Sequence, residues 1–179
     1  TSIGTTGQGL GIEGVAPSIA VAVDTYQNAN FGDPHYDHLA IHLNGDLNHN
    51  SANNIAGPVT ALENSDNIED CQWHIMRLSW NPTTTKITVY MDGRKRMHAT
   101  IDLVQNVFDG DPMVFWGFSG ATGAAKNHQR FCTSLNPFFS MDEDQVTCYP
   151  EPVLFRDNST SFGDIVQWFW DFGDGTIAT

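Results

Sequence analysis

The sequence is poor in basic residues and in cysteine, and it contains no long hydrophobic run. Of its 179 residues only eight are Lys or Arg, against 21 Asp and Glu, so the formal net charge is −13 at pH 7. A surface of this sign repels phosphate backbones, which excludes nucleic acid as a partner. No apolar run approaches the roughly 20 residues of a membrane-spanning helix, so we expect no membrane insertion.

The three cysteines are too few and too far apart to predict a zinc site. Cys71, Cys132 and Cys148 form no CxxC pair, and an odd number leaves at least one thiol without an internal partner. In an oxidising compartment the preferred bridge joins Cys71 and Cys132, because both fall in one expected domain. A buried, unbridged cysteine is the alternative.

Short alternating runs separated by turn residues dominate the chain. Asp92-Gly93 lies between two such runs and suits the positive φ angles of a tight hairpin turn. No segment longer than ten residues has uninterrupted helical periodicity. The pattern predicts an all-β protein, a sandwich rather than a barrel. The expected strands cover residues 18–24, 38–43, 73–80, 86–91, 96–101 and 113–119.

The composition changes near residue 136. The stretch LNPFFSMDEDQVTCYPEP (135–152) carries three prolines and an acidic run, which predicts a linker over 136–147. A second β domain is expected over 148–179. Because 32 residues cannot close a sandwich, we expect this second domain to be incomplete at its C-terminal end.

One loop between two apolar strands contains candidate metal ligands. Asp24, Asn28, Asp33 and His38 follow one another at spacings of four, five and five residues. Carboxylates and an amide oxygen suit a hard cation such as Ca²⁺, whereas a ring nitrogen suits a transition metal. The spacing alone is equally compatible with a surface turn rich in Asp and Asn.

The segment IAVAVDTYQNANFGDPHYDHLAIHLNG (19–45) resembles the metal-binding stretch of L-type (legume-type) lectins. In that family a strand enters D-T-Y/F-x-N, followed by D-P and by a His that opens the next strand. WHIMRLSWNPTTTKITVYMDG (73–93) resembles the family's central hairpin, and VFWGFSGATGAAKNHQ (114–129) resembles its late strand and sugar-facing loop. The resemblance covers residues 1–135, is nearest to secreted bacterial members, and implies a concanavalin-like jelly-roll sandwich.

The resemblance implies roles by position. Asp24 and Asp33 match two carboxylates that bind calcium and bridge to a neighbouring transition metal. Tyr26 matches the residue whose backbone carbonyl binds calcium and whose ring lies near the sugar. Asn28 matches the amide that binds calcium and donates to a sugar hydroxyl, and His38 matches an imidazole ligand of the transition metal. Calcium would order the loop without taking part in chemistry.

The sugar-facing loop and two departures complete the comparison. Gly123, Ala124 and Ala125 match the loop whose backbone N–H groups contact the sugar. Ala22 stands where the family has a Glu ligand, so a weak or empty transition-metal position is expected. Residues 1–18 lack the family's upstream sugar-binding Asp, so we expect the lectin-like domain to be incomplete at its N-terminal end. Aromatic residues would then be uncovered, among them Trp73, Trp80, Phe115 and Trp116.

The tail resembles a different family. VLFRDNSTSFGDIVQWFWDFGDGT (153–176) is similar to the first half of a PKD-type repeat, which implies a partial Ig-like β-sandwich. Trp168 and Trp170 would be core anchors and Gly173–Gly175 a hairpin turn. Asp171 and Asp174 are expected as turn and strand-end residues rather than as ligands.

These patterns predict a calcium-dependent carbohydrate-binding module, without catalysis, of a secreted or cell-surface bacterial protein. An adhesion or structural β module without sugar affinity is one alternative. A glycoside hydrolase is another, but it needs paired carboxylates about 5 to 9.5 Å apart, and Glu13, Glu63 and Glu69 form no such run. The patterns predict neither the sugar nor the oligomeric state. The histidines expected to be ordinary surface or core residues are His35, His42, His49, His74, His98 and His128.

Overall fold

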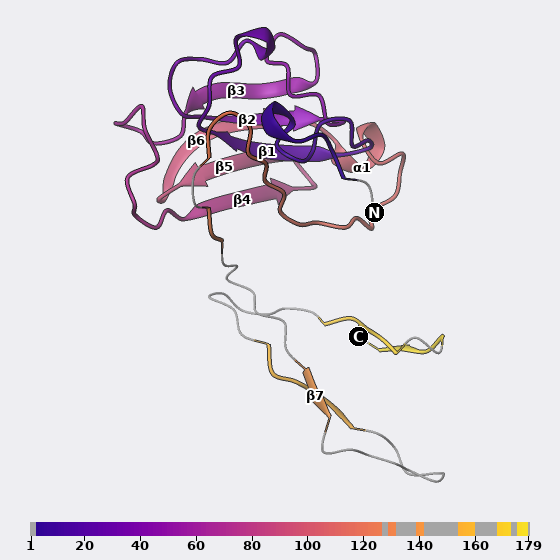
Figure 1. Cartoon of the computed structure of the whole chain (residues 1–179). Coiled ribbons are helices and arrows are strands. Elements are labelled where there is room, and N and C mark those ends of the chain that lie inside the picture. The colour runs from indigo at the N-terminus through magenta and orange to yellow at the C-terminus, as the bar shows by residue number, and fades with distance from the viewer. Residues whose placement is uncertain are drawn as a thin grey trace. The chain divides into compact units, whose positions relative to one another are not determined.

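The computed structural model describes residues 3–126, 129–131, 139–141, 154–159, 168–172 and 175–178. The chain divides into two compact units, Thr1–Asn127 and His128–Thr179 (Figure 1). Each unit consists mostly of antiparallel strands, so the all-β expectation is confirmed for the described residues. None of the helices in these ranges is long and apolar enough to cross a membrane.

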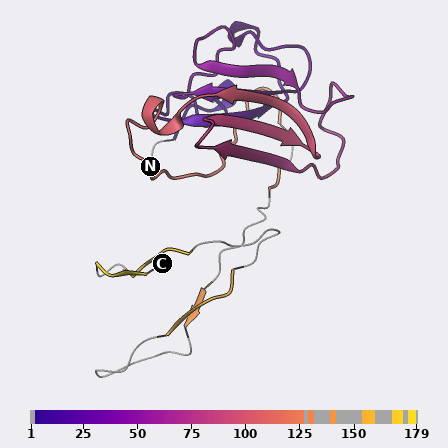
Figure 2. The same ribbon diagram turned by 180° about the vertical axis from the view of Figure 1, so that it is seen from behind.

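The first unit contains two antiparallel three-stranded sheets, with strand orders β1-β2-β3 and β4-β5-β6 (Figures 1 and 2). Its helical turns are short: η1 (Gly7–Gly9), η2 (Ala29–Phe31) and α1 (Leu103–Asn106), and Asp102 caps α1. The strands are β1 (Ile19–Asp24), β2 (His38–Leu43), β3 (Asn54–Thr60), β4 (Met76–Asn81), β5 (Lys86–Met91) and β6 (Arg94–Thr100).

The hydrophobic core lies between the two sheets. Leu39 and Ile41 of β2 belong to the same buried cluster as Ile87 and Val89 of β5. Met97 of β6 is also a member of this cluster. Successive side chains of a strand point to opposite faces, so alternate residues of β2 supply this cluster. The other face of β2 carries His38, Ala40 and His42, and these residues are also fully buried.

The two-residue connection between β5 and β6 is formed by Asp92 and Gly93, whose φ angles are 49° and 76°. Both values are positive, which confirms the predicted hairpin turn. Asp92 also accepts hydrogen bonds from the backbone of Ile75 and from the ring of His74. β4 therefore begins at Met76, a little later than expected, because the two preceding residues bond to the hairpin turn.

The observed strands differ from the expected ones in two places. β3 lies outside the expected strands, and its Gly57-Pro58 pair is more typical of a turn. The structure tolerates the proline because β3 lies at an edge of its sheet and its register with β2 is irregular there. The run 113–119 is not a strand: it pairs with no other described strand, and Phe115 and Trp116 are exposed. Alternating sequence cannot make a strand without a hydrogen-bonding neighbour.

Two expectations about exposed or buried side chains need correction. Trp80 was expected to be uncovered, but it is half-buried and packs against the core cluster. Cys71 is exposed and free, which contradicts a buried thiol, while its expected partner Cys132 lies outside the described residues.

The second unit pairs β7 (Phe139–Met141) with β8 (Phe155–Asp157), and β9 (Trp170–Asp171) with β10 (Ile177–Ala178). The expected linker over 136–147 thus contains strand β7. The Trp170 side chain is half-buried, and its ring lies 6.2 Å from that of Phe155 and is stacked with that of Phe172. Trp168 is 43% exposed, and its indole N–H bonds to Asp157. Gly173 and Asp174 of the expected turn lie outside the described residues.

Candidate metal centre

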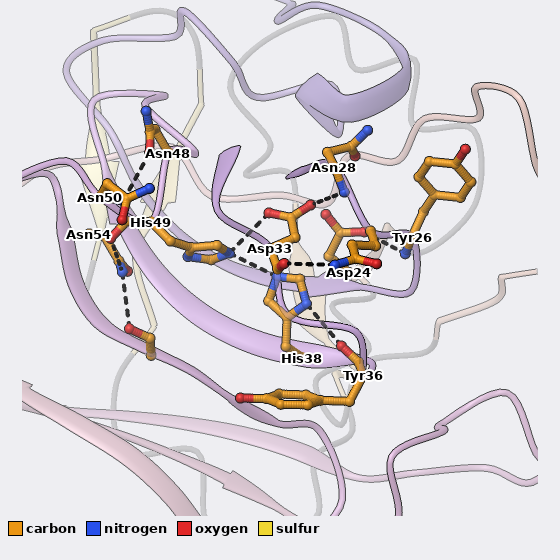
Figure 3. A network of polar contacts seen from close by, with 12 residues as sticks. Asp24, Tyr26, Asn28, Asp33, Tyr36, His38, Asn48, His49, Asn50 and Asn54 are labelled. Carbon is orange, nitrogen blue, oxygen red and sulfur yellow. Dashed lines mark hydrogen bonds and ion pairs between the residues drawn. The ribbon is translucent and has the colours of Figure 1, made fainter. Parts of the chain in front are cut away.

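The centre is built where β1 ends and β2 begins. In the antiparallel register Asp24, the last residue of β1, is directly opposite His38, the first residue of β2. Both side chains therefore project from the same face of the sheet. The loop that connects the two strands carries Asp33, and it returns over this face to bring the three side chains together (Figure 3).

Backbone amides of the same loop orient both carboxylates. The backbone N–H of Tyr26 donates to Asp24 Oδ1 over 2.9 Å, and the backbone N–H of Asn28 donates to Asp33 Oδ2 over 2.6 Å. The Gln27 side chain donates to the backbone carbonyl of Asp33. Asp24 and Asp33 are both buried. The loop thus holds two carboxylates in place before any ligand binds.

The electrostatics of the two carboxylates favour a cation. Burial raises the pKa of Asp24, and the nearby carboxylates of Asp33 and Asp37 add to this effect. The Tyr26 amide and the His38 ring lower this pKa, but they do not cancel the increase. A bound positive charge would offset the cost of burying these neighbouring negative charges.

Two imidazoles meet on the other side of Asp33. His38 Nε2 lies 2.9 Å from His49 Nε2, and His49 Nε2 lies 3.4 Å from Asp33 Oδ1. One ligand atom from each of these three residues lies within 4.8 Å of the other two. His38 Nδ1 faces the backbone carbonyl of Tyr36 at 3.3 Å. Figure 3 shows His49 on one side of Asp33, Asp24, Tyr26 and Asn28 on the other side, and His38 below it.

Burial favours the neutral form of two of the neighbouring histidines, His49 and His42. It lowers the pKa of His49, and the adjacent His38 lowers it further, while Asp33 raises it. Burial likewise lowers the pKa of His42, to about 4. The His49–Asp33 contact is therefore a polar contact of a neutral ring near pH 7 rather than an ion pair. Neutral imidazole is the form that binds metals.

The loop 44–53, which carries His49, is attached to the loop 25–37, which carries Asp33. The backbone N–H of His49 donates to the carbonyl of Phe31 over 2.8 Å, and Asn54 donates to the carbonyl of His49 over 3.1 Å. At Gly32, where φ is 78°, an added Cβ would lie 2.6 Å from the side chain of Asn50. The His49–Phe31 hydrogen bond and this close approach join the two loops. The Asn54 bond attaches His49 to the start of β3.

The structure brings together the five residues expected in the metal loop. Asp24, Asp33 and His38 are buried, Asn28 is half-buried, and the Tyr26 side chain is 49% exposed. The expected sugar-facing residues Gly123, Ala124 and Ala125 lie in an exposed loop.

The sugar-facing loop and the metal loop are both tied to the segment around η1. Ser119, at the start of the region that leads to 123–125, donates to the carbonyl of Leu10. Gln8 of η1 accepts a hydrogen bond from the side chain of Asn30 in the metal loop. The η1 segment is therefore a common support for the two loops.

His49, which was expected to be an ordinary surface or core residue, lies beside Asp33 and His38 in the candidate centre. It lies in a loop with no metal-ligand spacing, so local pattern analysis could not assign it to the centre. One signal was available: in β2 His38 and His42 alternate with core residues, which predicts a face with two imidazoles that need polar partners. His49 supplies a polar partner for His38 Nε2, and its ring centroid also lies 5.0 Å from that of His42.

Comparison with models of known protein families matches residues 1–135 to the legume lectin beta-barrel domain. The matched range contains β1 to β6, the metal loop and the 123–125 loop, and it covers well over half of the 179 residues. Together with the buried carboxylates and imidazoles between β1 and β2, this match establishes that the chain belongs to the L-type, or legume-type, lectin family.

Proposed function

We propose that this chain is a calcium-dependent carbohydrate-binding module without catalytic activity. Family membership indicates carbohydrate binding. The observation that carries calcium dependence is the pair of buried carboxylates, Asp24 and Asp33, that backbone amides of a single loop hold in place. The half-buried Asn28 and the exposed Tyr26 lie in the same loop, where a ligand in solvent can reach them.

The donors of this loop fit a hard cation. Asp24 and Asp33, the backbone carbonyl of Tyr26 and the amide oxygen of Asn28 would hold Ca²⁺, which prefers oxygen ligands. Calcium supplies positive charge that balances the carboxylates. The side chain of Asn28 makes no capping bond to η2, so its amide oxygen is not used by the helical turn and can bind calcium, while its N–H₂ can donate to a sugar hydroxyl. An ordered loop binds a sugar without the entropic cost of becoming ordered.

The other sugar contacts in this proposal come from two exposed elements. The Tyr26 ring offers an apolar face against which a sugar ring can pack. Backbone N–H groups of Gly123, Ala124 and Ala125 are the additional donors. Within this loop, the Gly123 N–H bonds to the carbonyl of Ala125.

A hydrolase is the less favoured function. The family is not a catalytic one, and two of the glutamates named above as catalytic candidates, Glu13 and Glu63, contact other side chains. Glu13 is bonded to the Thr5 hydroxyl. Glu63 is exposed and approaches Arg94 at 3.5 Å. Neither residue belongs to the metal loop.

We place the protein outside the cell, as a secreted or cell-surface bacterial component with a PKD-type spacer over 148–179. Extracellular calcium sites bind with dissociation constants of about 10⁻⁴ to 10⁻³ M, a range suited to a loop with two carboxylates. The aromatic packing of Phe155, Trp170 and Phe172 supports a sandwich-type spacer. Fractionation of cells that express the full-length protein tests the location, and a cytoplasmic protein would contradict it.

The decisive experiment measures calcium and sugar binding together. Calorimetry should give about one Ca²⁺ per chain, and Asp33→Asn should abolish the binding because it removes a charged ligand. Asp66→Asn, at an exposed carboxylate in a different loop, is the matched control and should bind normally. A glycan array should give signals that chelation of calcium removes. Calcium binding without any glycan signal would instead favour the adhesion module, and equal affinity of Asp33→Asn and wild type would reject the site.

A further inference from the structure

We propose that the outer face of the sheet β4-β5-β6 binds an acidic polysaccharide, a polymer whose anionic groups are carboxylates or sulfates. The residues that would bind these groups are Arg77, Lys86 and Lys95. The metal loop joins β1 and β2 of the other sheet, so this second surface does not require calcium.

The positive charge of the protein is concentrated in this sheet. Five of the eight Lys and Arg residues lie between residues 76 and 100, and the only acid in that stretch is Asp92. Strands β4, β5 and β6 and their turns make up the stretch. Residues 1–75 contain no Lys or Arg at all. An anion is therefore attracted to this sheet and repelled by the acidic remainder of the chain.

Three of the five bases are consecutive in the sequence, but the structure turns them apart. Arg94 approaches Glu63 at 3.5 Å, and the guanidinium of Arg96 donates to the backbone carbonyl of Thr60. Lys95 is the member of the run that lies on the outer face. Folding thus selects which charges of the run are available to a ligand.

The strand register places the remaining cations on one face. Arg77 is opposite Tyr90, which is opposite Lys95, so these side chains form a row across the three strands. The Arg77 guanidinium lies 4.0 Å from the centre of the Tyr90 ring, so the two share a face. Lys86 belongs to the same face because it alternates with the core residue Ile87. Figure 2 views the molecule from the side of this sheet.

The three cations are exposed and available. Among the described residues, no carboxylate forms an ion pair with Arg77, Lys86 or Lys95. Asp92, at the end of the sheet, instead accepts hydrogen bonds from the ring of His74 and from a backbone amide. A ligand can therefore bind these cations without first breaking an ion pair.

The spacing of the cations fits an extended anion. Strands are about 4.8 Å apart and residues about 3.4 Å apart along a strand, so the backbones of Arg77 and Lys95 are roughly 10 Å apart. The backbone of Lys86 is roughly 14 Å from that of Tyr90. One small anion cannot contact all three cations, whereas anionic groups repeated along a polymer can.

The other side chains of this face favour a sugar polymer. Hydroxyl, amide and imidazole groups, which can hydrogen-bond sugar hydroxyls, lie between the cations. They belong to Ser79, Asn81, Thr88, His98 and Thr100. A membrane surface is disfavoured because interfacial binding needs apolar side chains, and on this face of the three described strands Tyr90 is the only aromatic one. Duplex DNA is disfavoured because it binds proteins through many phosphate contacts, and only three fixed charges lie here.

The first test measures binding of the 179-residue chain to polygalacturonate, dextran sulfate and uncharged dextran by calorimetry, with a calcium chelator present. We expect binding to at least one acidic polymer and none to dextran, and the two acidic polymers distinguish carboxylate from sulfate. Affinity should fall about tenfold or more between about 0.05 and 0.2 M salt, because the contacts are ionic. Equal binding of dextran, binding to neither acidic polymer, or tighter binding to duplex DNA or phosphatidylserine vesicles would overturn the proposal.

The second test removes charge at chosen places. The double variant Arg77→Gln, Lys95→Gln should weaken binding of the acidic polymer about tenfold or more. Arg94→Gln with Lys126→Gln is the matched control, because it removes the same charge at exposed residues outside this face. Lys86→Glu should weaken binding as well, and urea unfolding checks that every variant is folded. Equal weakening by the two double variants would mean that only net charge matters, and it would overturn the proposal.

Both tests are independent of the calcium site. They are carried out without free calcium, so their failure would leave the calcium-dependent glycan site standing. Loss of calcium binding in Asp33→Asn would likewise leave binding of the acidic polymer unchanged.

Discussion

Asp33 lies between the proposed calcium loop and the two imidazoles of the candidate centre. Its Oδ2 accepts the Asn28 N–H, and its Oδ1 faces His49. The two oxygens of one carboxylate are thus turned toward different neighbours. Substitution of Asp33 should therefore affect calcium binding and the contact with His49 together, whereas substitutions on either side of it should affect one of these at a time.

A substitution at Asn28 should separate calcium binding from sugar binding. Asn28→Asp keeps a side-chain oxygen for calcium but removes the N–H₂ that would donate to a sugar hydroxyl. We expect calcium affinity within about tenfold of wild type and a loss of glycan binding, because a buried donor to the sugar is replaced by an acceptor. Calorimetry with calcium and then with an array-selected glycan measures both. Retained glycan binding would show that Asn28 does not donate to the sugar.

Ala22 offers a test of metal preference. Ala22→Glu places a carboxylate on the face of β1 that carries Asp24, so it should raise manganese affinity relative to zinc by about tenfold. Ala20→Glu is the control: it lies on the same face but is opposite His42, farther from Asp24. Competitive titration with the two ions checks the ratio. An equal change in both variants would mean that only the added charge matters.

At the scale of elements, the close packing of β3 on β2 makes a quantitative prediction. Gly57 has φ of 87°, and an added Cβ would lie 2.5 Å from the Leu39 carbonyl oxygen and 2.9 Å from Ala40 Cα. Gly57→Ala should lower the free energy of unfolding by about 2 kcal/mol or more, because β3 must shift.

Gly93 provides the matched control for that prediction. It also has a positive φ, 76°, but an added Cβ would meet no atom within 4 Å. Gly93→Ala should therefore cost only the backbone strain, about 1–2 kcal/mol. Urea unfolding of both variants measures the difference. Equal losses would show that the β2–β3 contact relaxes freely.

The hairpin turn of β5 and β6 should make stability depend on pH. A hydrogen bond to Asp92 raises the pKa of His74. A raised pKa means that this contribution to stability is fully present below the unfolded pKa of about 6.5 and is lost as the pH rises through the folded value. The unfolding midpoint of wild type should therefore fall relative to that of His74→Gln between about pH 6 and pH 9.

Comparison of the two curves isolates His74 from the other titrating groups. Those groups include the buried His42, whose lowered pKa gives the opposite sign: its contribution is lost as the pH falls. Because both proteins retain His42, its effect cancels in the difference. Parallel curves for wild type and His74→Gln would contradict the prediction.

At the scale of the whole molecule, the net charge and the exposed apolar side chains have opposite effects on self-association. The net charge of −13 keeps chains apart, but Trp73, Phe115 and Trp116 are exposed, with Trp116 at 72%. At about 0.1 M salt, the repulsion between exposed charges more than about 10 Å apart is largely screened. The attraction between exposed apolar side chains remains. We expect the 179-residue chain to self-associate more strongly as salt concentration rises.

Light scattering at increasing salt measures this self-association. The double variant Phe115→Ser, Trp116→Ser should scatter less than wild type and unfold at the same urea concentration, since neither side chain is buried. Trp80→Ser is the contrasting variant: its ring packs against the core, so it should lower stability instead. Association that is unchanged in the double variant would place the contact elsewhere.

Local patterns in the sequence determined much of this protein. Strands β1, β2, β5 and β6 and the Asp92-Gly93 turn follow from alternation and turn chemistry, which act between near neighbours. The ligand types in the loop between Asp24 and His38 likewise follow from adjacent residues, and their order supports the family assignment over 1–135. Each of these features depends on interactions within a few residues.

Tertiary structure decided the features that depend on distant residues. β3 forms despite Gly57-Pro58 because it pairs at a sheet edge, and the run 113–119 does not form a strand because no strand among the described residues pairs with it. His49 joins His38 and Asp33 only because its loop folds back and bonds to Phe31. Burial then lowers the pKa of His49. No local pattern contains these contacts, because the folded chain creates them between segments that are separate in the sequence.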